Sequence, residues 1–144
     1  MNQILDNRSD PYELLDQLEW PLELLQDERK MRTFICACCR LMWDRLPEVA
    51  RKALVVAEDY IEGKSSAEML LSERVKLWDY LGHESCDFGS AEVNAVRAVI
   101  CCLYEYDHEA FDTIRLVLDF CDGIGDYRQA QYQLLSNIYG YSRS

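Results

Sequence analysis

The chain has 144 residues, of which 49% are apolar, and a formal net charge of −11. This length suffices for one domain that buries a core without disulfides or metals. Nucleic acids and anionic membranes suit such an acidic chain poorly, because both are polyanions. No apolar run approaches the ~20 residues of a membrane span, and the first residues lack a signal-peptide pattern. The sequence therefore predicts a cytoplasmic protein that binds neither nucleic acid nor membrane.

Helix signals follow one another along the whole chain. Asp10 suits the cap of a first helix, Gly63 the end of a later one, and Ser90 the start of another. Ser65 and Glu68 have the spacing of a capping box. The expected helices, in chain order, are Pro11 to about Leu18, about Asp27 to Leu46, Pro47 to Glu62, Ser65 to Gly82, Ala91 to about Tyr106, Ala110 to Cys121, and Gln131 to Tyr139.

No segment has the alternating pattern of a β-strand, and no long linker or tandem repeat divides the chain. We therefore expect residues 1–144 to form a single all-α domain. The expected architecture is a compact bundle of about six to seven helices around a buried central Cys-rich helix.

Three of the seven cysteines lie within four residues, in the sequence Thr33-Phe-Ile-Cys-Ala-Cys-Cys-Arg40. At about 100° per residue on a helix, Cys36, Cys38 and Cys39 point in three directions, and only Cys36 and Cys39 are neighbours. An odd number of cysteines in a cytoplasmic chain argues against a disulfide framework. Free Cys behaves as a small apolar residue, so the pattern favours close packing of this helix against the one that carries Cys101 and Cys102.

Thiol or metal chemistry is the alternative interpretation of these cysteines. It would use Cys36 and Cys39 together with Cys101, Cys102 or His108. Structural zinc needs four ligands from spaced pairs, and reactive thiols favour a helix N-terminus, whereas these cysteines lie inside helices. Glu105 and His108 have Glu-x-x-His spacing, but no second such pair is visible. We therefore predict no cofactor and no metal, and favour a non-enzymatic protein, while enzymatic activity stays open.

Charge is unevenly distributed along the chain. Residues 29–52 hold seven bases and two acids, whereas residues 53–126 hold sixteen acids and five bases. One interpretation is that these are solvated helix faces that neutralise one another. The more specific interpretation is that the acidic residues form a surface that binds a basic protein partner. The sequence does not predict the oligomeric state. The candidate partner-binding residues are Asp79, Glu84, Asp87, Glu105, Asp107, Glu109, Asp112, Tyr127 and Tyr141.

Three blocks of sequence belong together as one pattern. They are Arg-Lys-Met-Arg-Thr-Phe-Ile-Cys-Ala-Cys-Cys-Arg-Leu-Met-Trp over 29–43, Arg-Lys-Ala-Leu-Val-Val-Ala-Glu-Asp-Tyr-Ile-Glu-Gly over 51–63, and Gln-Tyr-Gln-Leu-Leu-Ser-Asn-Ile-Tyr-Gly over 131–140. Together they resemble a bacterial domain family that is frequent in planctomycete-type proteins. The family has no established activity, cofactor or catalytic residue to carry over. The resemblance implies a domain that is often joined to other modules, which is consistent with binding. Our leading hypothesis is a non-enzymatic protein-interaction module of a regulatory or immunity type.

Overall fold

The computed structural model describes residues 10–19, 27–82, 90–104 and 110–139. These residues form seven α-helices and one short 3-10 helix, and they contain no strand. The helices are α2 (Pro11–Glu19), α3 (Glu28–Leu41), η2 (Trp43–Arg45), α4 (Glu48–Ile61), α5 (Ala67–Tyr80), α6 (Ala91–Cys101), α7 (Ala110–Asp122) and α8 (Arg128–Tyr139). The prediction of an all-α bundle is confirmed.

Most helices begin and end where the capping residues predict. Asp27 accepts a hydrogen bond from the Lys30 amide, and Ser90 accepts one from the Val93 amide. After α4 the chain turns through Gly63 at φ +77°, and the Lys64 amide donates to the Asp59 carbonyl at 2.7 Å. This arrangement is the Schellman turn for which glycine is favoured.

The predicted capping box at Ser65 is wrong by one residue. Ser66 is the cap of α5, and its hydroxyl accepts from the Met69 amide. The Ser65 hydroxyl instead donates to the Val56 carbonyl on α4, at 2.9 Å. Ser65 therefore does not cap α5, because its hydroxyl forms a hydrogen bond with the neighbouring helix α4.

Two helices are shorter than predicted. The expected helix over 27–46 ends at Leu41, where the Met42 amide turns back to the Cys39 carbonyl and the 3-10 turn η2 follows. Met42 and Leu46 are nevertheless buried as their spacing predicts. The helix expected to reach Tyr106 ends at Cys101, and Asp107 lies outside the described residues.

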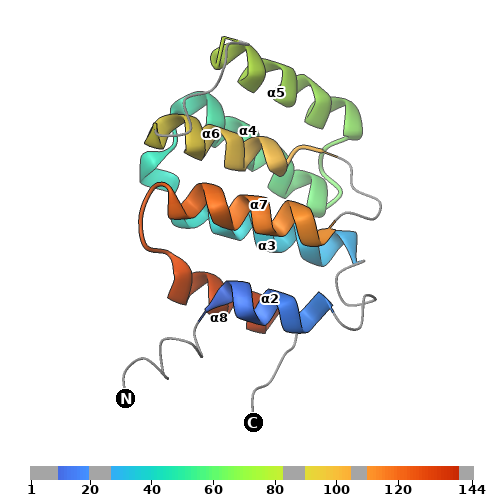
Figure 1. The fold of residues 1–144 in the computed structure, drawn as a ribbon. Coiled ribbons are helices and arrows are strands. Elements are labelled where there is room, and N and C mark those ends of the chain that lie inside the picture. The colour runs from blue at the N-terminus through green and yellow to red at the C-terminus, as the bar shows by residue number, and fades with distance from the viewer. Residues whose placement is uncertain (1–9, 20–26, 83–89, 105–109, 140–144) are drawn as a thin grey trace.

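The helices lie in successive pairs, with α2 beside α8, α3 beside α7, α4 beside α6, and α5 at the far edge (Figure 1). Helix α3 contacts α4, α6, α7 and α8, so it is surrounded as the pattern predicts. Phe34, Ile35, Cys38 and Cys39 on this helix are fully buried. In contrast, α5 packs only on α4 and, less closely, on α6 among the main helix contacts of the described chain. One side of α5 is therefore left to solvent.

In the described part of the chain, no helix has the length and apolar character needed to span a bilayer.

Candidate functional site

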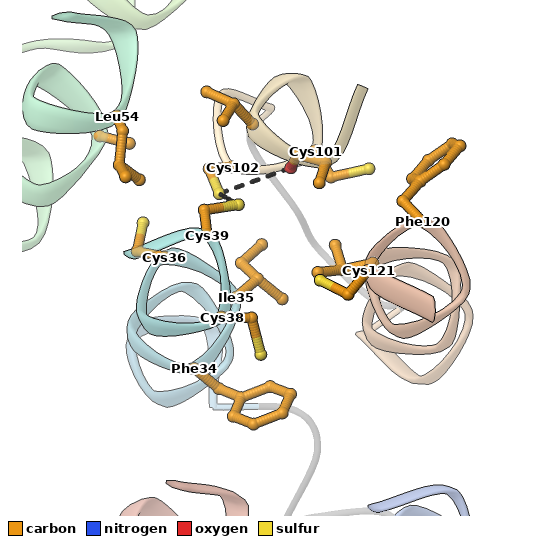
Figure 2. Close-up of a cluster of buried hydrophobic side chains, with 14 of the residues drawn as sticks. Phe34, Ile35, Cys36, Cys38, Cys39, Leu54, Cys101, Cys102, Phe120 and Cys121 are labelled. Carbon is orange, nitrogen blue, oxygen red and sulfur yellow. Dashed lines mark hydrogen bonds between the residues drawn. The ribbon is translucent and has the colours of Figure 1, made fainter. Parts of the chain in front are cut away.

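The Cys-rich segment packs against the C-terminal end of α6. The thiols of Cys39 and Cys102 lie 3.6 Å apart, and the Cys102 thiol also lies 3.7 Å from the Ala98 carbonyl of its own helix (Figure 2). The pKa of the Cys36 thiol is raised well above its usual value, mainly by its contact with Cys102 and secondly by burial. Cys36 and Cys39, the two cysteines that the helical spacing makes neighbours, thus both meet Cys102.

Cys38 points to another side of α3 (Figure 2). The pKa of the Cys38 thiol is raised well above its usual value, mainly by burial and secondly by the nearby Cys121 thiol. Burial likewise raises the pKa of Cys101 and of Cys121 to about 12. A thiol reacts as its thiolate, so these side chains are held in the unreactive form at neutral pH.

Sequence inspection missed the central role of Arg32. Its side chain is only 1% exposed, and it donates to the Cys102 carbonyl at 2.7 Å and to the Glu28 carboxylate at 2.8 Å. The guanidinium also lies over the Tyr60 ring, 4.8 Å from its centroid. Arg32 therefore joins α3 and α4 to the carbonyl end of α6, where a positive charge is favoured.

The spacing of residues along α3 could have predicted that Arg32 lies on the same side of the helix as Cys36 and Cys39. Arg32, Cys36 and Cys39 stand at i, i+4 and i+7, so they form one stripe along α3. All three meet Cys102. The Cys-rich segment of α3 thus places an arginine and two cysteines where they contact the end of α6.

The described residues hold no group of three or more His, Cys, Asp and Glu side chains that could bind a metal ion. His108, proposed as an alternative ligand, lies outside the described residues, and so does Cys86. The six described cysteines are free and buried. Cys36 lines the groove between α3 and α4 described below, but it is only 2% exposed, so burial argues against thiol chemistry among these cysteines.

We expect the six described cysteines to resist labelling by a thiol reagent in the native protein at pH 8 and to react fully after unfolding. Burial excludes the reagent and raises the pKa of Cys101 and Cys121 to about 12, so raising the pH to 10 should add little labelling at these positions. Mass spectrometry of digested, labelled protein locates each site, with free cysteine as the reference thiol. Rapid native labelling at Cys36 or Cys39 would instead support thiol chemistry.

A groove of about 590 Å³ runs between α3 and α4 and extends to Leu134 on α8. Its α3 wall includes Arg29, Thr33, Cys36, Ala37 and Arg40. Its α4 wall carries the carboxylates of Glu58, Asp59 and Glu62. The groove holds both signs of charge, so its chemistry selects no single class of ligand.

Arg40 spans this groove. Its guanidinium donates to both carboxylate oxygens of Glu58, at 2.9 and 2.8 Å, and lies 4.2 Å from the centroid of Trp43. Arg51 stacks on the same ring at 5.3 Å and donates to the Trp43 carbonyl. The Arg40–Glu58 pair joins the basic segment 29–52 to the acidic segment 53–126, so part of the charge asymmetry is neutralised within the fold.

The structure describes three of the nine predicted partner-binding residues. Asp79 is exposed near the end of α5, and Asp112 is exposed in the first turn of α7. Tyr127 is half-buried against the core and packs over Gly125. Glu84, Asp87, Glu105, Asp107, Glu109 and Tyr141 lie outside the described residues.

Helix α5 is apolar on two sides. Leu70 and Leu77 are fully buried against the bundle, whereas Leu71 and Val75 are 48% and 50% exposed. Leu71 and Val75 are one turn apart, so they form an exposed apolar pair that the fold itself does not use.

Acidic side chains flank this pair. Glu68, Leu71, Ser72, Val75 and Asp79 follow the spacing of one helical stripe, and all five are exposed. We call these five residues the outer face of α5. Leu71 and Val75 form its centre, and a carboxylate stands toward each end. The half-exposed Lys76, which pairs with Glu73 at 3.1 Å, lies beside this face.

Comparison of the chain with protein-family models, with curated proteins and with solved structures gave no match.

Proposed function

We propose that this chain is a non-enzymatic protein-interaction module that binds a basic protein partner through an acidic surface centred on α5. The observation that carries the proposal is the outer face of α5, where Leu71 and Val75 are about half exposed between Glu68 and Asp79. Exposed apolar side chains that cluster on one helix face are typical of protein-binding surfaces. The flanking carboxylates favour a partner of positive charge.

A regulatory or immunity-type protein, which binds a basic partner and masks it, is the form of module that we favour. The deep burial of the described thiols supports this proposal over the thiol-dependent alternative. The net charge of −11 also supports it, because a field of one sign attracts an oppositely charged partner and raises the rate of association.

Charge reversal on α5 tests the proposal. We expect immobilised wild-type chain to retain a basic protein from an extract of its own source cells, and the Glu68→Lys/Asp79→Lys variant to lose it. The contact is electrostatic in part, so added salt should also weaken it. Affinity capture followed by mass spectrometry identifies the retained proteins.

The matched control is Asp16→Lys/Asp44→Lys, which changes the charge by the same amount at exposed positions on α2 and η2. Helix α2 lies at the opposite end of the bundle from α5 (Figure 1). Retention of a basic protein by wild type and control but not by the α5 variant supports the proposal. If nothing is retained, or if the retained proteins do not depend on α5, the proposal is wrong.

A further inference from the structure

We infer that α5 is a separable element of the fold, a helix that leaves the bundle as one unit while the other described helices stay packed. The inference goes beyond the proposed function, because it concerns how the chain opens when no partner is present. Parts of a folded protein open as cooperative units, and the units with few buried contacts open first. The packing of α5 has this character.

Only a small part of α5 belongs to the core. Among its 14 residues Leu70, Glu73 and Leu77 are buried, whereas seven of the 14 residues of α3 are buried. Helix α5 packs closely on α4, but it lies at the edge of the bundle (Figure 1), and α6 is its other main helix neighbour in the described chain. Its departure therefore leaves the contacts of α3 with α4, α6, α7 and α8 in place.

One of these three buried side chains is a carboxylate. The side chain of Glu73 is 6% exposed, and its Oε2 lies 3.1 Å from the ammonium of Lys76, which is 50% exposed. The Oε1 atom of Glu73 is buried and has no hydrogen-bond partner among the described residues. A buried polar atom without a partner favours the opened state, in which water reaches it. Glu73 thus opposes the docking that Leu70 and Leu77 stabilise.

The polar contacts between α5 and the region of α6 lie at the surface. Hydrogen bonds join Arg74 to the Leu103 carbonyl, Trp78 to the Tyr104 hydroxyl and Tyr80 to the Glu92 carboxylate. Arg74 and Arg97 also lie over the rings of Tyr104 and Trp78, 4.3 and 5.4 Å from the ring centroids. The side chains in these contacts are all partly or fully exposed. Such contacts contribute little, because water replaces them when the helix opens.

Detachment of α5 uncovers additional apolar surface. Leu70 and Leu77 lose their cover, and so does the part of the bundle that they meet. Because Leu71 and Val75 are already exposed, the detached helix is apolar on two sides. A partner that covers the outer face of the docked helix therefore shifts the population toward the closed state.

Native-state hydrogen exchange of the full chain, followed residue by residue by NMR, tests the inference. We expect the amides from Leu70 to Leu77 to exchange with one common free energy of opening. After correction for the intrinsic rates, they should exchange at least about a hundredfold faster than the buried amides of α3 and α7. Low concentrations of denaturant should change the α5 rates less steeply, because opening of one helix exposes less surface than global unfolding.

Two substitutions on α5 should change its exchange in opposite directions. Glu73→Met removes the unpaired buried oxygen at similar side-chain length, so the α5 amides should exchange about tenfold more slowly. Lys76→Met leaves the buried carboxylate without its cation, so they should exchange about tenfold faster. Met, Glu and Lys have similar helix propensities, and the α3 amides should change less than about twofold in both variants.

Equal exchange rates of α5 and α3 in the wild-type chain would overturn the inference, and so would a Glu73→Met protein in which both helices slow equally or neither slows. If Glu73→Met does not fold, Lys76→Met at its half-exposed position carries the test, and unchanged α5 exchange in that variant overturns the inference. These measurements need no partner. Failure of the inference therefore leaves the proposed function to be decided by affinity capture alone.

Discussion

Replacing Arg32 with alanine is expected to lower the free energy of unfolding by about 3 kcal/mol. The side chain is almost wholly buried, so its removal leaves a cavity between α3 and α4. It also leaves the Cys102 carbonyl, at the end of α6, without its donor. An unpaired buried acceptor costs about 1–3 kcal/mol by itself.

Two further substitutions help to interpret this result. The first separates the charge of Arg32 from its volume, and the second removes an exposed arginine for comparison. Arg32→Met keeps most of the volume but removes the donors, so we expect a loss of about 2 kcal/mol. Arg40→Ala removes an arginine whose side chain is 46% exposed and whose pair with Glu58 is therefore weak, about 1 kcal/mol or less. Chemical denaturation followed by circular dichroism gives all three values. An Arg32→Ala protein as stable as Arg40→Ala would show that the buried contacts contribute little.

Replacing Cys102 with leucine is expected to cost about 1–3 kcal/mol, more than replacing it with alanine, which should cost about 1 kcal/mol. The Cys102 thiol lies 3.6 Å from that of Cys39, so a larger side chain there forces α3 and α6 apart. If packing is the role of these cysteines, stability depends on the size of the side chain at this position and function survives the change to alanine.

The measurement combines thermal unfolding with the affinity capture described above. Cys38→Ala serves as the control, because Cys38 lies on another side of α3 (Figure 2) and its removal should also cost about 1 kcal/mol. Loss of binding in a folded, stable Cys102→Ala protein would favour thiol chemistry over packing. A Cys102→Leu protein more stable than the alanine variant would contradict close approach of the two helices.

Local sequence predicted the helices well because their boundaries depend on capping residues a few positions apart. Gly63 and Ser90 act as their sequence context indicates. The errors occur where another helix competes for the same group. Ser65 bonds to Val56 across the α4–α5 turn, which no local rule weighs.

The role of α5 shows the same limit. Its apolar residues fall on two sides, Leu70 and Leu77 on one and Leu71 and Val75 on the other, and sequence alone does not say which side meets the bundle. Only the position of α5 at the edge of the fold decides that the second pair is exposed (Figure 1). The sequence suggested Asp79 as a candidate for partner binding, but it did not suggest the exposed pair Leu71 and Val75.

The sequence by itself determined the all-α class, most helix boundaries and the burial of the Phe34–Cys39 segment, because helical periodicity and capping are local properties. Tertiary structure decided that Cys36 and Cys39 both meet Cys102, that Arg32 is buried beside them, and that Leu71 and Val75 are exposed. These facts depend on which helices become neighbours. That choice is made by long-range packing, in which one stripe of each helix is buried and the remaining stripes are left to solvent.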